Sequence, residues 1–154
     1  VLIACSLKLG AIIAGAGDGD AEKIYGLGIE LGLAFQLQDD YLDAFGDMAK
    51  FGKTIGGDIT TNKKTFLYLK AFELAKGDRL INLTNYFLSD EFTGEKKIRA
   101  ILDLYRQLDL QRITRDAIGR HHLKAKEILE SLGFEPGRTA ELGALMEEML
   151  GREK

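Results

Sequence analysis

Residues 35–43 read FQLQDDYLD and set three carboxylates and two amides into an otherwise apolar helical pattern. Side chains three and four positions apart lie on one face of a helix, with about 5–6 Å between their Cβ atoms. The spacing predicts one acidic stripe, formed by Gln36, Asp39, Asp40 and Asp43. The leucines of this helix are expected to be buried on its other sides: Leu33, Leu37 and Leu42. Because bare carboxylates this close repel one another, the stripe indicates a bound cation.

The composition indicates one all-helical domain over residues 1–154. The chain is 45% hydrophobic and 29% charged, which is ordinary for a globular protein of 154 residues with a substantial core. It contains one proline and no tryptophan, and its β-branched residues show little alternation. The net charge is −3, with acidic and basic residues interspersed. This charge distribution does not indicate binding to nucleic acid or to an anionic membrane.

Two further features bear on the setting and extent of the chain. The single cysteine, Cys5, lies in an apolar run, so no disulfide can form within the chain. A reducing, cytoplasmic location is the simplest inference. The chain begins at Val1, without a methionine, inside a strongly apolar pattern. We therefore expect a fragment whose N-terminal part is missing.

Residues 1–16 are almost uniformly apolar. They are too few for a membrane span, which needs about 20 residues. Lys8 lies inside the segment and no basic region precedes it, unlike in a signal peptide. We predict a helix that is buried on most of its sides in an α-helical core.

Helices and one long loop are predicted in the rest of the chain. A helix is expected over residues 21–45, with Asp20 as its N-cap. Gly28 and Gly32 weaken this helix, so we expect them where another helix approaches closely. The glycine-rich residues 46–62 predict an ordered functional loop. Amphipathic spacing predicts further helices around residues 66–72, 80–88, 98–105 and 118–132, and a last one that begins at Pro136.

Two other motifs fail on spacing. Residues 52–54, Gly-Lys-Thr, resemble the end of a P-loop, but the glycine required five positions earlier is Asp47, and no strand precedes it. His121 and His122 are adjacent, so on a helix they point about 100° apart and cannot easily bind one metal ion. We expect both to be surface histidines or satisfied interior ones.

The acidic stripe has two interpretations on spacing alone. It can be a solvated helix end whose carboxylates pair with Lys50 or Lys53, or one wall of a metal site. The stripe follows the apolar residues 31–35, and the loop behind it offers Lys53 and Lys63. Carboxylates suit Mg²⁺ and lysines suit phosphate oxygens. The combination favours a site for Mg²⁺ and a diphosphate.

The same part of the chain resembles a known family. The resemblance is carried by residues 35–47 (FQLQDDYLDAFGD), 52–53 (GK), 57–59 (GDI) and 62–67 (NKKTFL). They resemble the second aspartate-rich motif, and the lysines after it, of the trans-isoprenyl diphosphate synthases. These are the farnesyl and geranylgeranyl diphosphate synthases of the polyprenyl synthetase family. Residues 2–16 also look like a segment of that family, and the likeness extends more weakly to the C-terminus.

The resemblance implies an all-α, antiparallel helix bundle of the isoprenoid synthase type, usually a homodimer. It implies a Mg²⁺-dependent prenyltransferase that condenses an allylic diphosphate, such as dimethylallyl, geranyl or farnesyl diphosphate, with isopentenyl diphosphate. Residues 1–154 would form the C-terminal half of such an enzyme.

The resemblance also implies roles for individual residues. Asp39 would bind Mg²⁺ directly, and Asp40 and Asp43 would complete the metal site. Lys53 and Lys63 would hold the allylic diphosphate.

Three more residues complete the implied site. Gln36 would present a polar group near the allylic cation, and Phe35 would line the homoallylic side. Asp58 would support the acidic residues from outside the metal site. The implied catalytic residues are Gln36, Asp39 and Lys53.

Half of the family's catalytic residues have no counterpart in this sequence. The first aspartate-rich motif and its neighbouring arginines lie upstream of anything present here. We therefore expect the chain alone to be inactive. Two alternatives stay open at this point: a non-catalytic subunit of a heteromeric prenyl synthase, and a terpene cyclase on the same fold.

Overall fold

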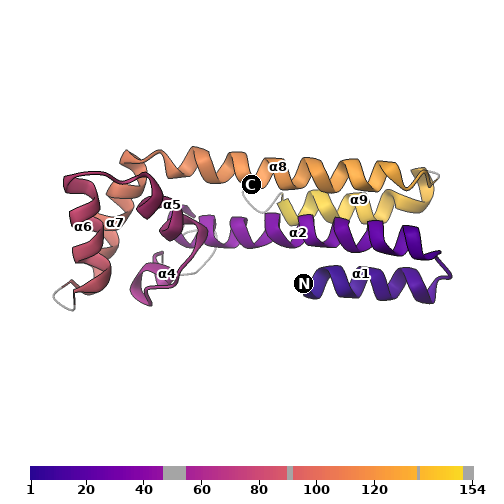
Figure 1. The fold of residues 1–154 in the computed structure, drawn as a ribbon, viewed down its shortest axis with the longest axis horizontal. Coiled ribbons are helices and arrows are strands. Elements are labelled where there is room, and N and C mark those ends of the chain that lie inside the picture. The colour runs from indigo at the N-terminus through magenta and orange to yellow at the C-terminus, as the bar shows by residue number, and fades with distance from the viewer. Residues whose placement is uncertain (47–54, 90–91, 135, 151–154) are drawn as a thin grey trace. The chain divides into compact units, whose positions relative to one another are not determined.

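A computed structural model describes residues 1–46, 55–89, 92–134 and 136–150. Within these ranges the regular structure is helical and no strand occurs, as predicted (Figure 1). The helices are α1 (Leu2–Ile13), α2 (Asp18–Phe45), α4 (Gly57–Thr60), α5 (Phe66–Leu74), α6 (Asp78–Leu88), α7 (Gly94–Gln107), α8 (Leu110–Ser131) and α9 (Pro136–Leu150). The chain divides into two compact units, residues 1–36 with 116–154 and residues 37–115.

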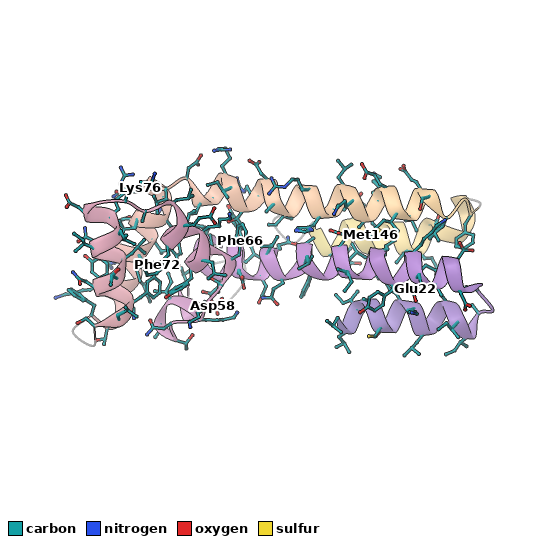
Figure 2. All side chains as sticks on the ribbon, viewed as in Figure 1. Glu22, Asp58, Phe66, Phe72, Lys76 and Met146 are labelled. Carbon is teal, nitrogen blue, oxygen red and sulfur yellow. The ribbon has the colours of Figure 1, made fainter. Side chains whose placement is uncertain are left out.

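The first unit contains α1, α9, the first part of α2 and most of α8, which lie side by side (Figure 1). Its core brings residues from three of these helices together: Leu27, Leu31, Ala125 and Met146. Met146 is labelled on α9 in Figure 2. Leu7 of α1 packs against the same cluster.

Helices α1 and α2 cross at Gly28, where their backbones meet. A Cβ atom on Gly28 would lie 2.4 Å from the Cα atom of Ala4, which is fully buried. Only glycine fits there, so the predicted close approach is confirmed at Gly28. At Gly32 a Cβ atom would meet the Ile3 side chain at 4.0 Å, which is an ordinary contact. The expectation for Gly32 was therefore wrong.

The prediction that the first helix is buried on most of its sides is also wrong. Ala4 is the buried residue of α1, whereas Leu2 is 82% exposed and Ile13 is 86% exposed. In the described part of the chain, α1 packs along one face only. Apolar residues occur on its other sides as well, where no neighbouring helix of the described ranges covers them. Across the same residues, no helix combines the length and the apolar character that a membrane crossing requires.

The second unit gathers the end of α2, helices α4 to α7 and the start of α8 around another core. Its largest members are Ile59, Leu67, Leu83, Phe87, Ile101, Leu102, Leu104, Tyr105 and Leu110. The ring of Tyr68 on α5 lies 4.7 Å from that of Phe87 on α6, measured between centroids. It lies equally close to the ring of Phe72, which Figure 2 labels. Aromatic packing thus joins α5 to α6.

The structure adjusts several predicted boundaries. Helix α2 begins at Asp18 and not at residue 21. Its first turn carries two carboxylates, whose negative charges interact favourably with the helix dipole. The predicted loop over residues 46–62 contains the one-turn helix α4. Helix α5 begins at Phe66, and the Oγ1 atom of its N-cap, Thr65, accepts a hydrogen bond from the Tyr68 amide at 3.2 Å.

Candidate functional site

The acidic residues of α2 point to different sides of the helix. Asp39 and Gln36 are exposed, whereas Asp40 is only 5% exposed and Asp43 is half-buried. Adjacent residues on a helix point about 100° apart, so Asp39 and Asp40 cannot share one surface. The prediction that the polar residues of α2 form one acidic stripe is therefore wrong, because Asp40 points away from Asp39. The predicted burial of Leu33 is also wrong, since this side chain is 45% exposed.

Asp40 connects α2 to the start of α5. Its Oδ2 atom accepts a hydrogen bond from the backbone amide of Phe66 at 3.3 Å. Its Oδ1 atom lies 3.5 Å from Nζ of Lys63. The two contacts use both carboxylate oxygens within the protein, so Asp40 holds the segment after α4 against α2.

Asp43 makes the corresponding connection to α4. Its Oδ2 atom accepts a hydrogen bond from the backbone amide of Asp58 at 3.0 Å. A Cβ atom on Gly57 would lie 3.1 Å from Oδ1 of Asp43, so a side chain there would crowd the carboxylate. Burial raises the pKa of the Asp43 carboxyl, although the bond from the Asp58 amide opposes the rise. Figure 2 labels Asp58 and Phe66, whose amides bond to these carboxylates.

Lys63 bridges the two carboxylates that face it. Its Nζ atom donates to Oδ2 of Asp58 at 3.0 Å and also lies near Asp40. The hydrogen bond to Asp58 raises the pKa of Lys63, against the opposing effect of desolvation. The lysine side chain is 47% exposed, so its charge is held in place and still reaches solvent.

These residues line one small pocket of the second unit. The lining residues are five polar ones, Asp40, Asp43, Asp58, Lys63 and Thr65, and five others, Ala44, Ile59, Leu67, Phe87 and Tyr105. Burial raises the pKa of the Tyr105 hydroxyl, and nearby acidic groups add to the rise, so this hydroxyl stays neutral. The sequence marked Tyr105 only as a core position of an amphipathic helix, and it gave no sign that Phe87 reaches the same pocket.

The other predicted site residues fall outside this cluster. Phe35 is half-buried and Gln36 is exposed, both on α2 in the turn before Asp39. Lys53, predicted to hold a diphosphate, lies outside the described residues, as does Lys50. The structure therefore brings Asp40, Asp43 and Lys63 together with Asp58.

The donor groups restrict how a metal ion can bind. Among the described residues, no three His, Cys, Asp or Glu side chains are arranged to hold a metal. Asp40 and Asp43 accept bonds from backbone amides, whereas Asp39 is exposed. Mg²⁺ is typically held by one or two carboxylates together with substrate phosphates and water. The donor set fits a Mg²⁺ ion that binds together with a phosphate ligand.

The fold defines the class of protein. The chain superposes on a crystal structure of geranylgeranyl pyrophosphate synthase with a TM-score of 0.87 and 42% identity, covering 100% of this chain and 48% of the other. It also superposes on geranylgeranyl pyrophosphate synthase from Corynebacterium glutamicum, complexed with isoprenyl diphosphate and magnesium. There the TM-score is 0.85 at 28% identity, over 97% of this chain and 42% of the other. The architecture is that of the isoprenyl synthases.

Residues 1–105 match the polyprenyl synthetase family, and the chain belongs to that family. It is 32% identical over 156 aligned residues to a short chain isoprenyl diphosphate synthase of Methanothermobacter thermautotrophicus, covering 99% of this chain and 46% of the relative. The chain spans about half the length of the relatives it matches. The resemblance carried by the aspartate-rich motif is thereby confirmed.

Proposed function

We propose that the protein carrying this chain is a Mg²⁺-dependent trans-prenyltransferase, in which residues 1–154 form the C-terminal half of the catalytic bundle. It would join an allylic diphosphate to isopentenyl diphosphate, head to tail. Membership of the polyprenyl synthetase family supports this proposal. A homodimeric assembly and a cytoplasmic location are part of the same proposal.

The observation that carries the proposal is the position of Lys63. This half-exposed cation is anchored by Asp58 and Asp40 at a pocket beside the helix that presents Asp39 to solvent. A diphosphate needs cations on both sides, and carboxylates alone would repel it. An anchored lysine together with an exposed carboxylate for Mg²⁺ meets both needs.

We assign the chain's residues the following parts in the reaction. Lys63 would donate hydrogen bonds to diphosphate oxygens, and its two carboxylate partners would limit its movement. Lys53 would add a second cation. When bound, Mg²⁺ would neutralise the negative charge that develops on the leaving diphosphate.

The three aspartates of α2 have different parts in this proposal. Asp39, the exposed carboxylate, would hold Mg²⁺ directly. Asp40 and Asp43 were predicted as ligands too, and their bonds to the Phe66 and Asp58 amides support an orienting part in the metal site.

Two residues in the turn before Asp39 complete the proposed site. Gln36 would direct its amide oxygen toward the positive charge of the allylic group. Phe35 would line the binding site of the second substrate.

The decisive experiment compares two proteins. The complete protein and the isolated 154-residue chain are each incubated with geranyl diphosphate, isopentenyl diphosphate and Mg²⁺, and the products are separated by chromatography. We expect a longer linear prenyl diphosphate from the complete protein and none from the chain alone. Turnover by the chain alone would overturn the proposed inactivity. A cyclic hydrocarbon would indicate a terpene cyclase, and a complete protein without product would indicate a non-catalytic subunit.

A further inference from the structure

We propose that Lys97 is a positioning residue that fixes the segment carrying Asp58 and Lys63. The side chain belongs to α7 and is only 5% exposed. Its Nζ atom donates to Oδ1 of Asn62 at 2.7 Å. The kinetic part of this proposal rests on the proposed function, whereas the structural part does not.

The burial of Lys97 needs a compensating interaction. Taking a lysine side chain out of water is unfavourable unless its amino group is paired. The hydrogen bond to Asn62 supplies one partner, and the ring of Phe87 lies 5.6 Å from Nζ, which allows a cation–π contact. Both contacts lead to the candidate site, because Phe87 lines the pocket and Asn62 directly precedes Lys63.

Asn62 occupies a backbone conformation that needs support. Its φ angle is +53°, in the left-handed region that non-glycine residues rarely adopt, although asparagine tolerates it better than most. This corner ends the α4 turn, where the Lys63 amide bonds to the Asp58 carbonyl at 2.9 Å. The direction in which the chain leaves the turn therefore depends on Asn62, and the Lys97 bond holds that side chain in place.

The other end of the turn is held by the next residue of α7. Gly56, the N-cap of α4, has a φ angle of +85°. A Cβ atom there would lie 2.7 Å from Cγ2 of Ile98, so the backbone of Gly56 packs directly on that side chain. Two consecutive residues of α7 thus hold both left-handed ends of the turn that carries Asp58.

The consequence is a chain of contacts from α7 to the proposed ligand. Lys97 holds Asn62, Asn62 sets the direction of the following residue, and Lys63 then meets Asp58 and Asp40. Lys97 itself need not touch a substrate. Its loss should weaken diphosphate binding by letting Lys63 move, and should leave the chemical step largely unchanged.

The test uses the complete protein with Lys97→Met, which keeps an unbranched side chain, shorter by one atom, and removes the donor. Lys96→Met is the matched control, because Lys96 is the neighbouring lysine on α7 and is exposed. Hydrogen–deuterium exchange of the peptide covering residues 57–66 measures the segment directly. We expect exchange about tenfold faster in Lys97→Met only, as for the loss of one hydrogen bond to a charged group. Unchanged exchange would overturn the proposal, whether or not the protein turns over.

Kinetics and a second position separate positioning from general stability. Lys97→Met should raise KM for the allylic diphosphate about tenfold and change kcat little, since one such bond is lost.

Asn62→Gly removes the acceptor while tolerating the positive φ, and in that background Lys97→Met should raise KM no further. Asn62→Asp keeps an acceptor and should retain the original KM. Equal effects of Lys97→Met in both backgrounds would show that Lys97 does not act through Asn62. A complete protein without prenyltransferase activity would refute the proposed function alone, because the exchange measurement still decides the part of Lys97.

Discussion

Lys63 donates to Asp58 across 3.0 Å, and the same Nζ atom lies 3.5 Å from Asp40, so one lysine joins α4 to α2. Lys63 can serve substrate binding or only the stability of the fold, and its mutation can distinguish these two roles. If the lysine serves a diphosphate, its removal affects substrate binding. If it serves only the fold, its removal affects stability.

Lys63→Ala in the complete protein should raise KM for the allylic diphosphate by about tenfold or more, because a charge-assisted bond to phosphate is lost. The free energy of unfolding should fall by no more than about 1 kcal/mol, since ion pairs that reach solvent contribute little. Steady-state kinetics and thermal denaturation on the same preparation measure both quantities. A lower melting temperature with unchanged kinetics would show a purely structural ion pair.

Asp39→Ala should lower kcat about hundredfold, comparable to the loss of one group that stabilises developing charge. Because Asp39 is exposed, the melting temperature of the variant should stay within a degree or two of that of the parent protein, as for other surface substitutions. Titration of activity with Mg²⁺ should show a higher half-saturating concentration. Unchanged activity and Mg²⁺ dependence would remove Asp39 from the metal site.

Asp40→Ala provides the contrasting case on the same helix. This carboxylate is buried and accepts the Phe66 amide, so its removal leaves a buried donor without its partner. We expect a loss of about 1–3 kcal/mol in the free energy of unfolding, measured by urea denaturation. A loss no larger than that of Asp39→Ala would contradict the structural part given to Asp40.

The difference in burial between Asp39 and Asp40 could not be predicted from the sequence. The helical period predicts that α2 carries the aspartates, but it cannot tell which of two adjacent carboxylates will be covered. That depends on Phe66 and Lys63, which approach from 26 and 23 positions later in the chain. The family motif named Asp40, Asp43 and Lys63 together, and the structure places all three at one pocket. The roles that the motif implies for them stay a prediction.

Contacts outside the motif were not predictable in this way. Tyr105 and Lys97 lie in an amphipathic helix, and nothing in their spacing tells that one lines the pocket and the other bonds to Asn62. The apolar pattern of residues 1–16 predicted a helix correctly and its burial incorrectly. Burial depends on the neighbours that the fold supplies, and local sequence does not contain them.

Gly28→Ala tests the crossing of α1 and α2. The added methyl group would lie 2.4 Å from the Ala4 Cα atom, so α1 must move, and we expect a loss of about 1–3 kcal/mol in the free energy of unfolding. Gly32→Ala is the matched control on the same helix, where the nearest atom lies at 4.0 Å. It should be neutral or stabilising by up to about 1 kcal/mol, because alanine favours the helix. Equal losses at both positions would contradict the crossing described here.

Glu30 gives the first unit a pH dependence of known sign. Its carboxylate is 14% exposed, lies 2.6 Å from Nδ1 of His121 and accepts from Lys124 at 3.2 Å. Burial alone would raise the pKa of Glu30, but the hydrogen bonds from His121 and Lys124 outweigh it and leave the pKa below its ordinary value. The unfolded chain therefore takes up this proton first as the pH falls. The stabilisation is present above the ordinary glutamate pKa and is lost as the pH falls through the folded value.

Glu30→Gln should accordingly be less stable than the parent at neutral pH, and the difference should shrink as the pH falls from about 5 toward 3. Urea denaturation at a series of pH values measures the free energy of unfolding of both proteins. Glu127→Gln, at an exposed position of α8, reports the general effect of removing one negative charge. A difference between Glu30→Gln and the parent that stays constant with pH would mean that the shape of the side chain, and not its charge, stabilises the contact between α2 and α8.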